Sequence, residues 1–270
     1  MIGDTPLNHQ ARKRFGQNFL VDSNIIEKIV NAIAIKPSDK LIEIGPGKGA
    51  LTGPLLQQCP SLTAIELDRD LAAHLRQWQE KYPHFNLIEK DVLNVDFAQL
   101  AQQQPVRIVG NLPYNISTPL IFHLLGYRHL IQDMHFMLQK EVVERLNANP
   151  NTKAYGRLSI MVQYSAKVDY LFTVEPSCFS PPPKVTSAIV RLTPFKQLAF
   201  PASDEKLFAT VVATCFQMRR KTLRNCLRKL CSDDIINALP IDLGARPEDL
   251  SVQDFVELSN AIALHRGTEA

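Results

Sequence analysis

Helical spacing of apolar residues is the first clear pattern in the chain. Between residues 23 and 33 they recur three or four positions apart, at Ile25, Ile26, Ile29, Val30 and Ile33. Asp22 and Ser23 come first, and such side chains can accept hydrogen bonds from the free N–H groups of a first helical turn. The pattern predicts a helix that begins near Asp22.

Further along, short apolar runs alternate with stretches of helical length. The runs lie at residues 41–44, 62–67, 87–88, 107–109 and 134–138. Strands that alternate with helices are typical of a parallel, doubly wound sheet with helices on both faces. We therefore predict an α/β fold.

The pattern changes after residue 159. Strand-like runs at 160–162, 170–172 and 188–190 follow one another, and Ser180-Pro181-Pro182-Pro183 interrupts the chain before the last of them. Consecutive strands are typical of antiparallel pairing. We predict a mostly parallel, seven-stranded sheet that finishes with an antiparallel edge.

Strand signals stop near residue 197. Beyond it, helical spacing returns at Leu207, Phe208, Val211, Val212 and Cys215. We therefore expect two domains, an α/β domain over residues 1–197 and a small all-helical domain over residues 198–270.

Composition limits the kind of protein. The 270 residues are 45% hydrophobic, which is ample for a buried core, and no apolar run is long enough for a membrane span. The start of the chain is polar and basic, without the apolar centre of a signal peptide, so we expect a cytoplasmic protein. The five cysteines form no Cys-x-x-Cys pair, so we expect reduced thiols and no metal site.

Glycines alternate with other residues directly after the first predicted strand. Gly45, Gly47 and Gly49 allow the backbone to turn sharply, and Gly45 and Gly47 could approach a cofactor closely. The spacing is G-x-G-x-G, which weakens both a dinucleotide and a P-loop interpretation. A site for a nucleotide-like cofactor and an ordinary glycine turn both remain open at this point.

Acidic residues end the next two predicted strands. Glu66 lies where a carboxylate can accept hydrogen bonds from ribose hydroxyls, and Asp91 can accept one from the amine of an adenine. Either residue could instead cap a helix or lie in a solvated loop. Together, at one edge of one sheet, they favour recognition of adenosine, which S-adenosylmethionine and NAD share.

Asn111-Leu112-Pro113-Tyr114 follows the fourth predicted strand and suits methyl transfer to an adenine N6 amine. The lone pair of that amine is delocalised into the ring. Hydrogen-bond acceptors for both N–H groups would localise the lone pair on the nitrogen. The Asn111 side-chain oxygen and the Leu112 carbonyl can accept these two bonds. Pro113 stiffens the turn, and Tyr114 offers a ring for stacking. An ordinary turn after a strand is the alternative.

A base that leaves its stack gains from an aromatic partner in the pocket. Phe179, just before the three prolines, is our prediction for the wall opposite Tyr114. A core position for Phe179 beside a rigid connector is an equally open interpretation.

With these motifs in place, the chain resembles the KsgA family of ribosomal RNA adenine dimethyltransferases along essentially its whole length. Residues 12–20 resemble the family's N-terminal cofactor motif, in which the positions of Asn18 and Leu20 contact the methionine end of the cofactor. The remaining cofactor positions of the family fall on Gly45, Glu66, Asp91 and Asn111. The catalytic loop at 111–117 and the segments 179–185 and 219–225 also resemble this family.

This resemblance implies a Rossmann-like class I methyltransferase fold that binds S-adenosylmethionine, followed by an RNA-binding helical domain. It implies dimethylation of the N6 amine of two adjacent adenosines in the 3′-terminal hairpin loop of 16S ribosomal RNA during small-subunit biogenesis. The expected partners are small-subunit ribosomal RNA and the immature 30S subunit. We expect a monomer, because no exposed apolar helix requires a partner.

Basic residues gather near both ends of the chain, although the formal net charge is only +3. The side chains that we predict to bind RNA are Arg12, Lys13, Arg14, Arg219, Arg220, Lys221, Arg224 and Arg228. Three of these arginines lie four residues apart, opposite Leu223, Leu227 and Leu230, which predicts a helix with a cationic stripe. A solvated helix face is the alternative interpretation.

Other functions stay open on the sequence alone. An NAD-dependent oxidoreductase could use the same type of sheet, but it leaves residues 111–114 unexplained. An RNA-binding assembly factor could use this fold with catalysis dispensable. A large-subunit ribosomal RNA adenine methyltransferase could share the cofactor and catalytic motifs, and the basic C-terminal stretch favours the small-subunit alternative.

Overall fold

The computed structural model describes nearly the whole chain, and the described residues are 17–59, 61–102, 104–218 and 220–268. They divide into two compact units. The first comprises Met1–Val143 and Asp169–Pro194, and the second comprises Glu144–Val168 and Phe195–Ala270. The chain therefore enters the second unit twice, and residues 144–168 belong to it although they precede the domain boundary that we predicted at residue 197.

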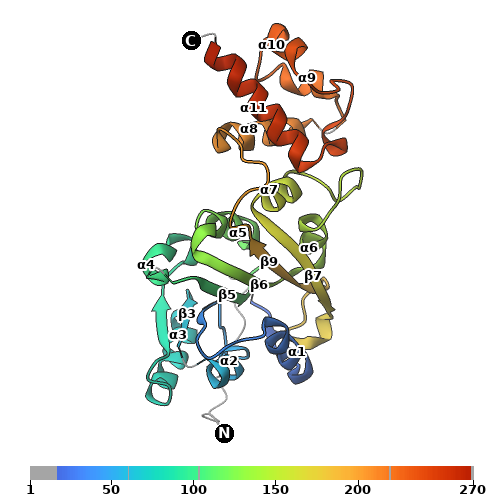
Figure 1. Cartoon of the computed structure of the whole chain (residues 1–270). Coiled ribbons are helices and arrows are strands. Elements are labelled where there is room, and N and C mark those ends of the chain that lie inside the picture. Colours follow the sequence, from blue (N-terminus) through green and yellow to red (C-terminus); the bar gives the residue numbers. More distant parts are fainter. Residues whose placement is uncertain (1–16, 60, 103, 219, 269–270) are drawn as a thin grey trace. The chain divides into compact units, whose positions relative to one another are not determined.

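The first unit is built around one mixed sheet (Figure 1). Its strands are β2 (Lys40–Ile44), β3 (Leu62–Glu66), β4 (Asn86–Glu89), β5 (Val106–Asn111), β6 (Ile131–Gln139), β7 (Ala166–Val174) and β9 (Ser187–Pro194). Within the described residues these seven strands lie in the order β4-β3-β2-β5-β6-β9-β7. Neighbours from β4 to β6 are parallel, and β9 is antiparallel to β6. The predicted doubly wound sheet with an antiparallel edge is confirmed.

The strand order reverses between β2 and β5, since the chain runs outward from β2 to β4 and then returns to β5 beside β2. In open α/β sheets, ligands bind outside the carboxyl ends of the strands at such a reversal. Gly45 directly follows β2 and Asn111 ends β5, so the fold brings the glycine turn and the catalytic loop to this position.

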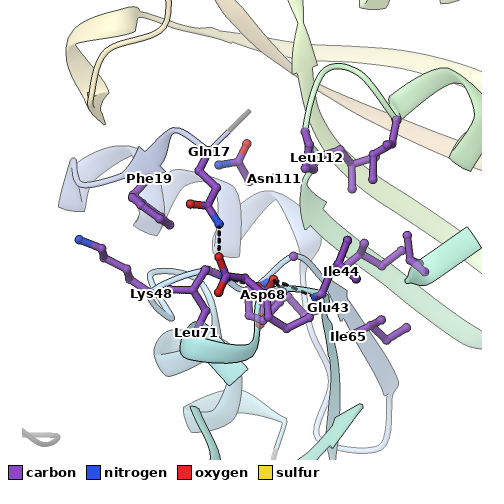
Figure 2. A pocket seen from close by; sticks show the side chains of 18 of the residues that line it. Gln17, Phe19, Glu43, Ile44, Lys48, Ile65, Asp68, Leu71, Asn111 and Leu112 are labelled. Atoms are coloured by element: carbon purple, nitrogen blue, oxygen red, sulfur yellow. Dashed lines mark hydrogen bonds between the residues drawn. The ribbon is translucent and has the colours of Figure 1, made fainter. Parts of the chain in front are cut away.

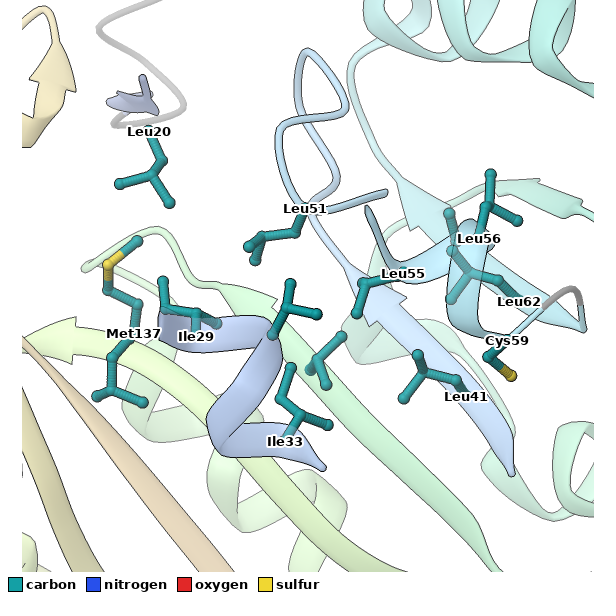
Figure 3. Close-up of a cluster of buried hydrophobic side chains, with 14 of the residues drawn as sticks. Leu20, Ile29, Ile33, Leu41, Leu51, Leu55, Leu56, Cys59, Leu62 and Met137 are labelled. Carbon is teal, nitrogen blue, oxygen red and sulfur yellow. The ribbon is translucent and has the colours of Figure 1, made fainter. Parts of the chain in front are cut away.

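Helices cover both faces of the sheet (Figure 1). The helices of this unit are α1 (Ser23–Ile33), α2 (Thr52–Gln58), α3 (Arg69–Arg76), α4 (Phe97–Ala101), α5 (Ser117–Leu125) and the start of α6 (Lys140–Leu146). α1 begins as predicted, because the Asp22 side chain accepts hydrogen bonds from the N–H groups of Asn24 and Ile25. Figure 3 shows Ile29 and Ile33 of α1 and Leu55 of α2 in one buried cluster with side chains of the sheet.

Two short strands lie apart from the main sheet. β1 (Phe19–Leu20) pairs antiparallel with β8 (Phe179–Ser180), and the Val21 N–H donates to the Cys178 carbonyl at 2.9 Å. This pairing brings the N-terminal motif beside the segment that precedes the three prolines. Single 3₁₀ turns lie at η2 (Gln77–Glu80), η3 (Val92–Asn94), η4 (Arg128–Leu130), η5 (Pro176–Cys178) and η6 (Pro247–Asp249).

The second unit is helical, as predicted. Besides the end of α6, its helices are α7 (Arg157–Ser165), α8 (Glu205–Gln217), α9 (Leu223–Leu227), α10 (Asp233–Ala238) and α11 (Val252–Thr268). Its core joins α7 to α8, where the Tyr164 and Phe208 rings lie 4.6 Å apart between centroids. No helix among the described residues has the length and apolar character needed to cross a bilayer.

Two predicted elements are wrong. The expected strand at residues 160–162 lies inside α7, where Ile160 and Val162 are fully buried. A buried helix is apolar on more than one side, so a run of three apolar residues does not reveal its period. The expected helix under the cationic stripe is also shorter, since α9 has only five residues and Arg220 precedes it. Leu223 and Leu227 are buried, so the apolar side of that prediction is confirmed.

Candidate active site

The glycine turn after β2 depends on left-handed backbone conformations. The φ angles of Gly45, Gly47 and Gly49 are 67°, 59° and 87°, which residues with a Cβ rarely adopt. A Cβ on Gly49 would also lie only 2.5 Å from the Trp78 ring. The turn therefore requires glycine, and it leaves the backbone open to close approach by a ligand.

A cleft opens at the carboxyl edge of the sheet, between the glycine turn and the loop after β5 (Figure 2). Every cofactor residue that we predicted lines this cleft, and these residues are Asn18, Leu20, Gly45, Gly47, Glu66, Asp91 and Asn111. They lie in or directly before β1, and at or just after the ends of four neighbouring strands. The fold thus brings together residues that lie nearly a hundred positions apart.

Glu66 connects the end of β3 to the glycine turn. Its Oε2 atom accepts a hydrogen bond from the Gly47 N–H at 3.1 Å, and its Oε1 atom accepts two, from Leu67 and Asp68, at 2.9 Å each. Burial raises the pKa of this carboxyl, and the three N–H donors offset part of that rise. A carboxylate offers about four acceptor positions, so about one remains for a ribose hydroxyl.

Asp91 caps a short helical turn and also lies at the cleft, so its position is compatible with both interpretations. Its Oδ1 atom caps η3 by accepting a hydrogen bond from the Leu93 N–H at 3.0 Å. The residue also lines the cleft, where its second oxygen can accept a bond from an adenine amine.

Asn111 is held by the N-terminal segment. Its side-chain Nδ2 group donates to the Asn18 carbonyl at 3.1 Å. Since the amide nitrogen is used in this way, the Oδ1 atom of the same amide is left as the acceptor for a substrate amine. The orientation is the one that the predicted chemistry needs.

The rest of the loop after β5 is fixed by hydrogen bonds within the loop and to the neighbouring strands β6 and β9. The Leu112 N–H donates to the Met137 carbonyl at 3.2 Å, and the Ser117 hydroxyl donates to the Tyr114 carbonyl at 3.1 Å. The Tyr114 phenol shares a 2.8 Å hydrogen bond with the Ser187 hydroxyl. Residues 111–114 all line the cleft, so the four members of the predicted motif lie together.

Phe179 is placed differently from our prediction. Its side chain is only 4% exposed, belongs to the buried cluster beneath β1 and is absent from the lining of the cleft. The structure therefore favours the alternative interpretation, in which Phe179 is a core residue.

The predicted RNA-binding residues fall into two groups. Arg12, Lys13, Arg14 and Arg219 lie outside the described residues. In the second unit, Arg220 and Lys221 are exposed, whereas Arg224 donates to Asn237 at 2.8 Å and Arg228 pairs with Asp233 at 3.2 Å. Arg220 and Lys221 are thus the more available cations of the four.

Sequence reasoning missed several polar residues of the cleft, among them Gln17, Glu43 and Asp68. Gln17 donates to the Asp68 carboxylate at 3.1 Å and links the N-terminal segment to the residue that caps α3 (Figure 2). Glu43 lies fully buried at the end of β2, and burial raises its pKa to about 8. Glu43 stands inside the motif that we recognised by its glycines, so its charge was a signal that could have been used.

A glycine turn and carboxylates at successive strand ends of a mostly parallel sheet are typical of a Rossmann-like protein that binds a cofactor with an adenosine half, as S-adenosylmethionine and NAD both have. The family model for ribosomal RNA adenine dimethylase matches residues 8–264, and the chain belongs to this family. The oxidoreductase alternative is thereby set aside.

Curated relatives and solved structures agree with this placement. The chain is 55% identical over 260 residues to the ribosomal RNA small subunit methyltransferase A of Hahella chejuensis, covering 96% of this chain and 95% of that protein. It is 54% identical over 256 residues to the protein of the same name from Acinetobacter baylyi, covering 93% and 92%. A dimethyladenosine transferase from Plasmodium falciparum superposes with a TM-score of 0.77 at 28% identity, covering 93% of this chain and 98% of that chain.

Proposed function

We propose that this enzyme transfers methyl groups from S-adenosylmethionine to the N6 amines of two adjacent adenosines in the 3′-terminal hairpin loop of 16S ribosomal RNA. Its substrate is the immature 30S subunit, on which it acts as a monomer in the cytoplasm. The observation that carries the proposal is the bond from the Asn111 amide nitrogen to the Asn18 carbonyl, which leaves the Asn111 oxygen as the acceptor for a substrate amine. Its relatives are ribosomal RNA small subunit methyltransferases, which supports the small-subunit target.

The residues of the cleft suit the cofactor and its adenosine half. S-adenosylmethionine supplies an electrophilic methyl group on a sulfonium. The glycine turn offers a close backbone approach, Glu66 accepts a ribose hydroxyl, and Asp91 accepts the adenine amine. Asn18 and Leu20 bound the cleft from β1 and are the residues that we place beside the methionine end.

The catalytic loop would activate the target amine by accepting hydrogen bonds from its N–H groups. Asn111 Oδ1 and the Leu112 carbonyl accept one N–H bond each, so the nitrogen lone pair is directed toward the methyl group. Tyr114 stacks on the target base and holds it in the cleft.

No strong general base is needed, because the nitrogen becomes acidic only once it has accepted the methyl group. Burial raises the pKa of the Tyr114 phenol, so this hydroxyl stays protonated at neutral pH. The proton passes to water instead, and the side chains of the loop contribute position and hydrogen bonds.

We assign RNA binding chiefly to the second unit. Arg220 and Lys221 are exposed and close in sequence, and cations of this kind bind phosphates with little preference for sequence. The basic residues 12–14 would add further phosphate contacts. Recognition of the hairpin then depends on its shape and on the base that enters the cleft.

Methyl transfer from labelled S-adenosylmethionine to unmodified small subunits tests the proposal, with nucleoside analysis of the RNA. We expect N6,N6-dimethyladenosine from the natural chain and none from Asn111→Ala, while Asn94→Ala, an exposed asparagine outside the cleft, behaves as the natural chain. If the cofactor binds but no label reaches the RNA, the assembly-factor alternative gains and the proposal is rejected. Label in large-subunit RNA alone would reject the proposed target.

A further inference from the structure

We propose that Ser187 is a positioning residue that sets the orientation of the Tyr114 ring. The inference rests on the proposed function, in which Tyr114 stacks on the target adenine. The Ser187 hydroxyl lies 2.8 Å from the Tyr114 phenol oxygen, and Ser187 is fully buried as the first residue of β9. It does not line the cleft, so it acts only through Tyr114.

The hydrogen bond from Ser187 fixes the side chain of Tyr114, whose orientation the backbone does not determine. The Tyr114 carbonyl accepts from the Ser117 hydroxyl at 3.1 Å, which holds the main chain of this residue at the start of α5. The side chain still has two rotatable bonds, and the residue is only partly buried. A hydrogen bond at the tip of the ring therefore selects one position of the stacking face.

Ser187 is a rigid support because the main sheet holds it. It lies opposite Gln139 in the antiparallel pairing of β9 with β6, and the preceding Thr186 carbonyl accepts from the Lys140 N–H at 3.0 Å. The catalytic loop is attached to the same strand, since the Leu112 N–H donates to Met137 of β6. Tyr114 is thus held at its main chain and at its tip by elements that share β6.

The expected consequence is a loss of rate without a loss of cofactor affinity. Removing one neutral hydrogen bond from the tip of the ring lets the ring leave its stacking position, and we expect the kcat of Ser187→Ala to fall roughly threefold to tenfold. The dissociation constant for S-adenosylmethionine stays unchanged, because neither Ser187 nor the phenol tip contributes to the predicted cofactor contacts.

A double-mutant cycle separates positioning from ordinary stability. Tyr114→Phe removes the same bond from its other end, so we expect Ser187→Ala, Tyr114→Phe and the double variant to lose about the same kcat. Ser187→Thr keeps a hydroxyl at this position and is expected to restore the rate. Thr193→Val removes a hydroxyl from the other end of β9 and serves as the matched control with unchanged kcat.

The outcomes distinguish a failure of the proposed function from a failure of the positioning role of Ser187. If the natural chain does not methylate small subunits, the proposed function fails. If it does, and Ser187→Ala matches it or the two single losses multiply in the double variant, the positioning role is overturned. Should Ser187→Ala fail to fold, Tyr114→Phe still tests the bond, because full kcat in that variant contradicts the inference.

Discussion

Glu43 is fully buried at the end of β2, and its Oε2 atom has no hydrogen-bond partner within the part of the chain that the structure describes. Burial raises its pKa from 4.5 to about 8, so the folded chain keeps this proton at pH values where the unfolded chain has lost it. The free energy of unfolding therefore falls as pH rises between these two values. Glu43→Gln removes that dependence, and we expect the variant to gain melting temperature relative to the natural chain at pH 8.

Thermal unfolding at pH 5, 7 and 8.5 checks this prediction about Glu43. Glu80→Gln, which changes an exposed carboxylate at the end of η2, is the matched control and should follow the natural chain at every pH. If the melting temperatures of Glu43→Gln and the natural chain change with pH in the same way, the buried carboxyl does not titrate as its surroundings indicate.

Gly110 lies one residue before Asn111 and has little room for a side chain. A Cβ at this position would lie 2.6 Å from the Ile44 carbonyl oxygen and 3.0 Å from Leu112 Cδ2. Gly110→Ala must therefore push β2 and β5 apart, at an expected cost of about 1–3 kcal/mol in the free energy of unfolding. Urea unfolding measures it, with Gly156→Ala as the control, because the nearest atom to a Cβ there is 3.9 Å away. An unchanged midpoint for Gly110→Ala would contradict the expected overlap.

Individual residues of the site were predictable where strand ends follow a known order. Glu66, Asp91 and Asn111 were assigned from their positions at strand ends, and Asn18 was assigned from the resemblance of residues 12–20 to the family's cofactor motif. The fold brings all four residues to one cleft. The bond from Gln17 to Asp68 was not predictable, because it joins two loops that are 51 residues apart in sequence. Phe179 was misplaced because an aromatic residue before prolines fits a pocket wall and a core position equally well.

At the scale of elements, Arg107 joins one end of α1 to the middle of the sheet. Its guanidinium pairs with Asp39 at 2.7 Å and with Asp133 at 2.9 Å, and it donates to the last carbonyls of α1 at Ile33 and Ala34. All of these groups lie largely out of solvent. Arg107→Met would leave two carboxylates without their cation, and we expect a loss of about 3–5 kcal/mol in the free energy of unfolding.

Arg191→Met is the matched control for Arg107. Arg191 pairs with Asp169 at 3.0 Å on the same sheet, but its side chain is 39% exposed, so we expect a loss of about 1 kcal/mol or less. Urea denaturation of the two variants makes the comparison. Equal losses would mean that burial of the Arg107 network contributes nothing beyond an ordinary surface ion pair.

Elements with strong periodicity were predictable, and those held by distant contacts were not. The helix at residues 23–33 and the parallel strands carry their own signals, in the cap at Asp22 and in the apolar runs. β1 and β8 have two residues each and exist only because they pair with each other. α7 was mistaken for a strand because it is buried against α8, so its apolar residues do not show one helical face.

At the scale of the whole molecule, the predicted contact with RNA depends on which cations are available. Arg220 and Lys221 are exposed, whereas Arg224 and Arg228 already bond to Asn237 and Asp233. We expect the double variant Arg220→Gln, Lys221→Gln to bind RNA several-fold more weakly. The slope of log K against log salt concentration should also become shallower, by about the amount that two phosphate contacts contribute. Titration of small-subunit RNA at several salt concentrations measures both quantities. A larger effect from the Arg224→Gln, Arg228→Gln pair would reverse this assignment.

The division into units predicts how the chain responds to truncation at residue 197. α7 belongs to the second unit, where Ile160 and Tyr164 pack against side chains of α8 such as Phe208. A chain of residues 1–197 keeps α7 but loses α8 to α11, so these apolar side chains become exposed. We expect this fragment to bind a hydrophobic dye and to melt below the full chain.

Phe208→Ala in the full chain is the comparison for this truncation. It weakens the same core by about 3–5 kcal/mol while every helix of the unit remains, so it should melt lower without exposing α7. A fragment that unfolds cooperatively at the temperature of the full chain, without binding dye, would mean that residues 1–197 are an independent domain after all. If the fragment binds dye and Phe208→Ala does not, residues 144–165 depend on the helices that follow residue 197. The boundary of the first unit then lies inside α6, between Val143 and Glu144.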